Sequence, residues 1–90
     1  MISGPPRASR REPGEIRAEI LKTCREPANK TAIVYRAGLN FRTVRPYLEQ
    51  LIKSGHLEVL RVGKQTRYQA TERGRELERS LRAMLENLEP

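Results

Sequence analysis

Apolar side chains recur at helical spacing in four segments of this 90-residue chain, and a stretch with strand-like alternation lies between the third segment and the fourth. The first segment, Pro13 to Arg25, predicts a helix with acids at its start and bases near its end, which complement the helix dipole. Pro27 ends it. Its apolar face comprises Ile16, Ile20, Leu21 and Cys24.

The next two segments predict two short helices that meet at a tight turn. Asn29 can cap a helix over Lys30 to Ala37, and Gly38 then supplies a left-handed turn residue. Asn40 can cap the second helix, which Gly55 ends. The apolar stripe of the second helix comprises Phe41, Val44, Leu48, Leu51 and Ile52. Its broadly opposite side comprises Arg42, Thr43, Pro46, Gln50 and Lys53, with Arg45 and Tyr47 on the flanks.

Pro46 breaks the pattern of this second helix. It removes a backbone donor and crowds the carbonyl of Arg42, at roughly 3 kcal/mol in a regular helix interior. Either Thr43 is the true cap, which moves Pro46 into the tolerant first turn, or the helix kinks on its outward side. Both arrangements change the register of the outward side chains.

A β-hairpin is predicted after the second helix. His56 to Val62 forms one strand, the chain turns through Gly63, Lys64 and Gln65, and Thr66 to Ala70 forms the other. Arg61 and Arg67 flank the turn, so cationic donors gather at its tip. Two helices joined by a turn and followed by a hairpin indicate a winged helix-turn-helix, a mainly α fold with a small β-hairpin (α+β), and so a nucleic-acid-binding module.

A final helix is predicted after Thr71, which is a good N-cap. The spacing of its apolar residues, at 4, 3 and 4 positions, is typical of a coiled-coil seam. A helix of about 17 residues is roughly 25 Å long, which favours a helix that projects from the domain and needs a partner. Alternatively, part of the stripe covers the first helix, as in a monomeric winged helix. The seam comprises Leu77, Leu81, Met84 and Leu88, and Leu85 widens it.

Three motifs, at Lys30 to Asn40, Tyr47 to Gly55 and Tyr68 to Gly74, resemble those of the small archaeal winged-helix DNA-binding proteins. That family includes dimeric regulators and chromatin-architecture proteins closed by a C-terminal antiparallel coiled coil. With the C-terminal helix, the resemblance covers residues Gly14 to Leu88. It implies that the second helix enters the major groove, that the wing touches backbone or minor groove, and that the final helix pairs with a second copy.

The resemblance assigns the groove contacts to Arg42, Thr43 and Arg45 on the helix and to Lys64, Gln65 and Arg67 on the wing. The neighbouring polar side chains complete the candidate DNA-binding set: Asn40, Gln50, Lys53 and Arg61. The implied dimer interface comprises Leu77, Leu81, Met84, Leu85 and Leu88.

The net charge of +7 is unevenly distributed along the chain. Residues 1–11 hold three arginines and no acid, residues 27–57 hold five bases and one acid, and residues 58–71 hold three bases and one acid. Each remaining segment has one acid more than its bases. The excess therefore coincides with the helix-turn-helix, the wing and the N-terminal tail, as phosphate binding requires, although a merely solvated surface would also be basic.

The amino-acid composition argues against catalysis and metal binding. The chain has no Asp, one His and one Cys, so we expect no enzyme, no metal site within one chain, no cofactor and no small-molecule ligand. Cys24 fits a buried thiol better than a redox or intersubunit role, and His56 fits a structural residue better than a pH sensor. No apolar run approaches 18 residues and no signal peptide is evident, so we expect a soluble protein in the cytoplasm, associated with the nucleoid.

The sequence therefore predicts a disordered basic tail (1–11), a winged helix-turn-helix domain (12–71) and a dimerisation helix (72–90). The expected function is that of a homodimeric transcriptional regulator that binds double-stranded DNA. An architectural nucleoid protein of low sequence specificity, or a winged-helix subunit that contacts protein or RNA, remain the alternatives.

Overall fold

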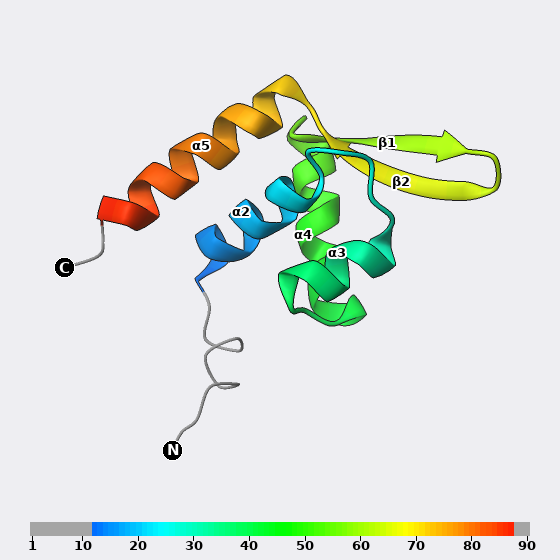
Figure 1. Cartoon of the computed structure of the whole chain (residues 1–90), viewed down its shortest axis with the longest axis horizontal. Coiled ribbons are helices and arrows are strands. Elements are labelled where there is room, and N and C mark those ends of the chain that lie inside the picture. The colour runs from blue at the N-terminus through cyan, green and yellow to red at the C-terminus, as the bar shows by residue number, and fades with distance from the viewer. Residues whose placement is uncertain (1–11, 88–90) are drawn as a thin grey trace, which may run out of the picture.

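The computed structural model describes residues 12–87, and this part of the chain contains four helices and one antiparallel hairpin (Figure 1). In chain order the elements are α2 (Pro13–Thr23), α3 (Lys30–Ala37), α4 (Phe41–Lys53), β1 (Leu57–Val62), β2 (Gln65–Ala70) and α5 (Glu72–Asn87). The predicted fold class, mainly α with a small hairpin, is confirmed. The predicted basic tail, residues 1–11, lies outside the described residues.

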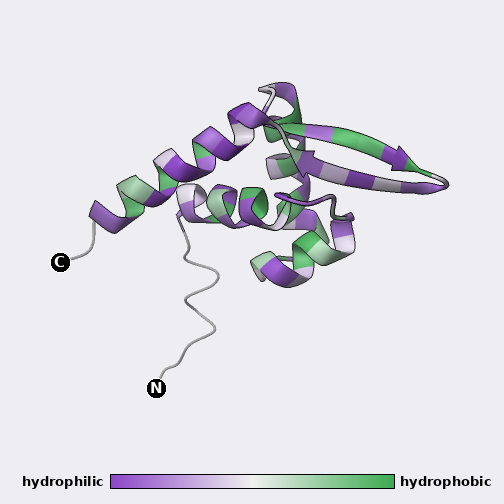
Figure 2. Cartoon of the chain, turned by 45° about the horizontal axis from the view of Figure 1, so that its top comes forward, coloured by the Kyte–Doolittle hydropathy of each residue, from purple (hydrophilic) through white to green (hydrophobic). Residues whose placement is uncertain are grey.

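Helices α2, α3 and α4 form the body of the domain, and the hairpin and α5 extend from it in opposite directions (Figure 1). Each helix of this body carries apolar residues interleaved with polar ones (Figure 2). The apolar residues meet in one core, whose largest fully buried side chains are Ile20, Leu21, Ile33, Val44 and Cys24.

Local signals at the helix ends act as the sequence predicts. The side-chain oxygen of Asn29 accepts a hydrogen bond from the Ala32 amide at 2.8 Å, and that of Asn40 accepts one from the Thr43 amide at 2.7 Å. Gly38, after α3, is left-handed with φ of 68°. These bonds satisfy amides that a helix cannot satisfy internally, and thereby define where each helix begins.

The start of α4 excludes one of the two alternatives at Pro46. Since Asn40 caps the helix and its carbonyl accepts from the Val44 amide at 3.0 Å, the suggestion that Thr43 is the cap is wrong. Pro46 therefore lies inside α4, on its exposed side, where the carbonyl of Arg42 lacks its usual helical donor.

The end of α4 is closed by a pair of backbone bonds around a left-handed glycine. The His56 amide donates to the Leu51 carbonyl at 2.9 Å and the Gly55 amide donates to the Ile52 carbonyl at 3.1 Å. Gly55 has φ of 83°, which L residues with side chains rarely adopt. His56 is thus part of the helix termination, and β1 begins at Leu57 rather than at His56 as predicted.

The first helix is shorter than predicted. It ends at Thr23 rather than Arg25, because Cys24 leaves the helical conformation and the chain turns to pair with the hairpin. Ala28 exchanges two backbone hydrogen bonds with Tyr68 of β2, at 2.9 and 2.8 Å. This bridge ties the α2–α3 connection to the base of the wing.

The hairpin pairs Leu57 with Ala70 at its base and Val62 with Gln65 at its tip. Gln65 therefore belongs to β2, and the turn consists of two residues, Gly63 and Lys64, rather than the predicted three. Gly63 has φ of 62°, as the first position of a tight hairpin turn requires.

The apolar stripe of α4 is narrower than predicted. Val44, Leu48 and Leu51 are buried and Ile52 is half-buried, but Phe41 is 52% exposed. Phe41 is the first residue of α4, and about half of its surface is left uncovered by the described residues.

Helix α5 begins with a close approach to the end of α4. The Thr71 hydroxyl accepts from the Gly74 amide at 3.1 Å and donates to the Gly55 carbonyl at 2.7 Å. Gly74 is buried, and a Cβ atom at this position would collide with the carbonyl of His56. The absence of a side chain at Gly74 therefore allows α5 to pack where it does.

The proximal apolar residues of α5 pack on the domain. Leu77 and Leu81 contact the core, as a stripe that covers the first helix would require. Farther along, Met84 is 62% exposed and Leu85 is half-buried, whereas Leu88 lies outside the described residues.

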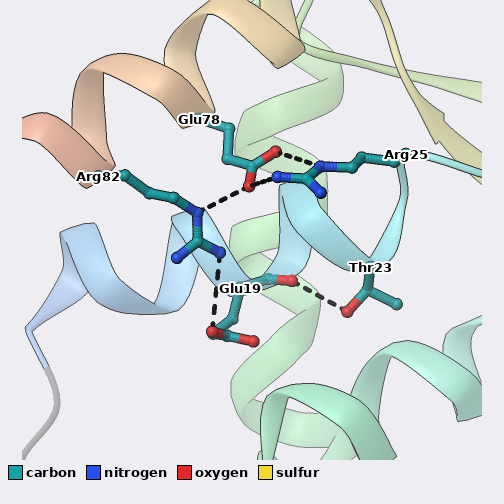
Figure 3. Close-up of polar contacts among 5 residues, drawn as sticks. All are labelled: Glu19, Thr23, Arg25, Glu78 and Arg82. Atoms are coloured by element: carbon teal, nitrogen blue, oxygen red, sulfur yellow. Dashed lines mark hydrogen bonds and ion pairs between the residues drawn. The ribbon is translucent and has the colours of Figure 1, made fainter.

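A buried carboxylate also joins α5 to α2 (Figure 3). Glu78 is 2% exposed and accepts hydrogen bonds from Arg25 at 2.6 and 3.0 Å and from Arg82 at 2.8 Å. Arg82 also lies 3.9 Å from the carboxylate of Glu19 on α2. Burial alone raises the pKa of Glu78, but the hydrogen bonds and charges of Arg25 and Arg82 outweigh it and hold this pKa below the ordinary glutamate value.

Among residues 12–87, no helix combines the length and the apolar character that a membrane crossing needs.

Candidate nucleic-acid interface

The outward side of α4 carries a row of exposed residues opposite the buried Val44, Leu48 and Leu51. At about 100° per residue, Arg42, Glu49 and Lys53 lie within roughly 40° of one another on this side. All three are exposed, and Pro46 lies beside them. The row makes α4 the element best placed to enter a groove of nucleic acid.

The cations of this row are largely uncompensated. Arg42 and Lys53 form no ion pair with any of the described residues. Arg45 lies 3.5 Å from Glu49, four positions along the helix, and both side chains are about 70% exposed, at 73% and 69%. Exposed pairs of this kind contribute little to stability, so Arg45 is not committed to a structural role.

Of the two remaining predicted residues at the start of α4, Asn40 uses its side chain to cap the helix. The side-chain oxygen of Asn40 is the helix cap, and Thr43, whose amide it binds, is half-buried on the flank. Their predicted DNA contacts would have to be made by the remaining polar atoms of each side chain.

At the wing, the predicted residues gather around the two-residue turn. Lys64 lies at the tip, and Arg61 and Lys64 are exposed without an ion-pair partner among residues 12–87. Arg67 donates to the side-chain oxygen of Gln65 at 2.9 Å, which holds its guanidinium along the hairpin. The wing thus carries exposed cations at a tight turn, and the hairpin projects from the domain body (Figure 1).

Gln50 has a partner that the sequence did not indicate. Its side-chain oxygen accepts a hydrogen bond at 3.0 Å from Arg17, which comes from α2. The guanidinium of Arg17 also lies over the ring of Tyr47, with its central carbon 5.6 Å from the ring centroid. The two residues of the hydrogen bond are 33 positions apart, so no local spacing could have revealed this contact.

The single cysteine and the single histidine of the chain belong to the fold rather than to this surface. Cys24 is fully buried, and burial raises the pKa of its thiol to about 12, which keeps it protonated and unreactive near neutral pH. His56 is half-buried with its Nδ1 atom 2.6 Å from the Ser54 hydroxyl. Burial and the charge of Arg73 lower the pKa of His56. In the described part of the chain, no three His, Cys, Asp or Glu side chains are grouped to hold a metal ion.

Comparisons with known proteins support this arrangement. A family model described as winged helix-turn-helix matches residues 10–89. The structure is similar to the crystal structure of Sso10a-2, a DNA-binding protein from Sulfolobus solfataricus, with a TM-score of 0.80 and 30% sequence identity. That alignment covers 84% of this chain and 80% of Sso10a-2. No functionally curated protein matches the chain.

Proposed function

The chain belongs to the winged helix-turn-helix family, as its three motifs indicated, and from this premise we propose that it binds double-stranded DNA. In this proposal α4 enters the major groove and the wing follows the backbone or the minor groove. The relative in Sulfolobus is itself described as a DNA-binding protein, which supports the same role here.

One observation carries the proposal: the outward side of α4 and the wing together hold several exposed cations that no carboxylate of the described residues pairs with. Arg25 and Arg82 hold the carboxylate of Glu78, whereas Arg42, Lys53 and Lys64 lack an acidic partner within the described residues. An uncompensated cation on a rigid surface releases counterions from DNA when it meets a phosphate, and this release supplies much of the affinity.

We further propose that the protein acts as a homodimeric transcriptional regulator. The distal part of α5 supports the dimer, because Met84 is exposed and Leu85 is half-buried while Leu77 and Leu81 are already used by the core. A second copy packed antiparallel on this part of α5 would place two α4 helices about a two-fold axis. The preferred site would then be a palindrome with half-sites about one helical turn, or a small multiple of it, apart.

The decisive experiment is titration of the protein with duplex DNA at several salt concentrations. If each subunit neutralises three or four phosphates, a dimer gives a slope of about −5 to −7 for log K against log salt, and a slope shallower than about −2 contradicts DNA binding of this kind. Selection of bound sequences from random duplexes separates the roles: a sharp motif supports a regulator, and a flat result supports an architectural protein. Stronger binding to RNA or single strands than to duplex would favour the interaction-subunit alternative.

The dimer has its own test. Met84→Glu places a charge on the exposed distal face of α5 and leaves the core residue Leu81 intact, so the fold should survive while the dimer dissociates. Light scattering at micromolar concentration measures the mass of both proteins. A monomer for the unmodified protein would refute the dimer and, with it, the palindrome.

A further inference from the structure

An open groove lies between the start of α2 and the middle of α4, and it joins two residues of the predicted DNA-binding set, Gln50 and Lys53, to residues of α2 that the sequence did not single out. Pro13 and Pro46 contribute apolar surface to it, and Arg17, Gln50 and Lys53 contribute polar groups. Lys53 also belongs to the outward row of α4, so the groove is continuous with the surface proposed to meet DNA.

Arg17 is held in this groove by two contacts of different kinds. The guanidinium lies over the ring of Tyr47, with its central carbon 5.6 Å from the centroid, and it donates a hydrogen bond to the side-chain oxygen of Gln50 at 3.0 Å. A guanidinium that lies over an aromatic ring and is hydrogen-bonded at one nitrogen has less rotational freedom before any ligand arrives. Both supports come from α4, so the position of Arg17 is tied to that of the helix.

The charge of Arg17 is not neutralised by the fold. Within residues 12–87 no carboxylate pairs with it, and its hydrogen bond to Gln50 is the one that its five N–H groups make there. This distinguishes Arg17 from Arg25, which pairs with the carboxylate of Glu78 at 2.6 Å. The only acid on the groove, Glu49, has its carboxylate beside Arg45 on the other flank of α4.

A fixed, uncompensated guanidinium beside a lysine suits an anion with several oxygens. We propose that this groove binds a phosphate of the DNA backbone, with Arg17 and Lys53 as its cationic ligands and with Tyr47 and Gln50 as residues that position Arg17. The inference rests on the proposed DNA binding and adds a contact from α2, so that two helices of each subunit bind the duplex. A phosphate contact fixes the orientation of the recognition helix without reading sequence.

The main test compares Arg17→Ala with Arg79→Ala, which removes the same charge from an exposed site on α5 that forms no ion pair with the other described residues. Arg17→Ala should weaken binding to duplexes of every sequence about tenfold at low salt and make the salt slope shallower by about 0.9 for each occupied groove. Arg79→Ala should change affinity less than about twofold and leave the slope unchanged.

The variant Arg17→Lys tests whether the geometry of the guanidinium matters or only its positive charge. The lysine keeps the charge but offers no planar fork of donors, so the salt slope should stay near that of the unmodified protein while affinity falls several-fold. Full affinity in Arg17→Lys would show that charge alone acts here, and would overturn the proposed geometry.

Double mutants test whether Tyr47 and Gln50 act by positioning Arg17. Gln50→Ala and Tyr47→Leu should each weaken binding several-fold in the unmodified protein and by less than about twofold when Arg17 is already alanine. Thermal denaturation of each variant, with and without Arg17→Ala, checks that any change in folding is the same in both backgrounds. An equal loss of binding in the two backgrounds would mean that Gln50 or Tyr47 does not act through Arg17.

The outcomes distinguish this inference from the proposed function. If the unmodified protein fails to bind duplex DNA, the proposed function fails and the groove inference fails with it. If the unmodified protein binds and Arg17→Ala matches Arg79→Ala, only the groove inference is wrong. If Arg17→Ala changes the preferred sequence, Arg17 reads bases and does not hold a backbone phosphate.

Discussion

Two groups of arginines differ in whether an acidic side chain pairs with them. One group lies at the contact of α2 with α5, and the other lies on α4. The sequence alone does not distinguish the two groups. At the α2–α5 contact, Arg25 and Arg82 surround one buried carboxylate, Glu78, and their charges are used inside the fold (Figure 3). On α4, Arg42 has no acidic partner among the described residues, and Arg45 has an exposed one. The two groups differ because the carboxylate beside Arg25 and Arg82 is buried, whereas the carboxylate beside Arg45 is exposed.

Burial of the acid matters because it sets the strength of the pair. A carboxylate removed from water must be compensated by hydrogen bonds and positive charge, and Glu78 accepts three hydrogen bonds from two guanidinium groups. Glu49 stays hydrated on the surface and constrains Arg45 only weakly. One region therefore uses charge to fix an angle between helices, and the other keeps charge available for a partner.

The largest expected effect comes from breaking the structural cluster. Glu78→Ala leaves two guanidinium groups without their shared partner at a half-buried site, so the free energy of unfolding should fall by roughly 2–4 kcal/mol. Urea denaturation measures it. Glu76→Ala, on the exposed side of the same helix, is the control and should change stability by less than about 0.5 kcal/mol. Equal effects of the two substitutions would contradict a stabilising role for the cluster.

The second prediction concerns the approach of α5 to the end of α4. Gly74→Ala adds a Cβ atom against the backbone carbonyl of His56, so α5 must shift, and stability should fall by about 1–3 kcal/mol. Denaturation midpoints measure the change. Gly14→Ala is a useful control, since a Cβ there would meet Leu81 at an ordinary distance of 3.7 Å and should be tolerated. A stable Gly74→Ala protein would show that α5 docks differently.

The third prediction addresses the outward side of α4 and the wing. Under the proposed docking, in which the side chain of Arg42 reaches base edges, Arg42→Ala should weaken DNA binding by about 1–3 kcal/mol and relax the preference at particular base pairs. Lys64→Ala on the wing should weaken binding to all sequences alike. Binding assays on a selected site and its single-base variants measure both. Wing variants that alter sequence preference, with no such effect from Arg42→Ala, would reverse the proposed docking.

The smallest expected effect is the loss of stability of the fold at low pH. Since Arg25 and Arg82 hold the pKa of Glu78 below the ordinary value of 4.5, the ionised carboxylate stabilises the fold above that pH, and this stabilisation is lost as pH falls through the lower pKa of the folded protein. Partial exposure of both arginines screens the effect. In denaturation experiments between about pH 5 and 2, the free energy of unfolding should fall less with decreasing pH for Glu78→Gln than for the unmodified protein. Identical pH profiles would mean that protonation of a group other than Glu78 causes the loss of stability.

The sequence by itself determined the features that depend on a few neighbouring residues. Asn29 and Asn40 cap their helices, Gly38 and Gly55 end them, and Gly63 makes the hairpin turn, because these residue types satisfy local hydrogen bonds or adopt positive φ. The resulting order of elements was sufficient to predict the winged helix-turn-helix and to mark its cationic surface.

Only the tertiary structure decided how residues distant in sequence share their charges and surfaces. Glu78 looks like any solvated acid of a charged helix until the fold brings Arg25, 53 positions away, to its carboxylate. Leu81 fits a coiled-coil seam by spacing, yet it packs against the core, and Phe41 fits the apolar stripe yet about half of its surface is left uncovered. Periodicity states which face of a helix is apolar, whereas the packing of neighbouring elements decides how much of that face is covered.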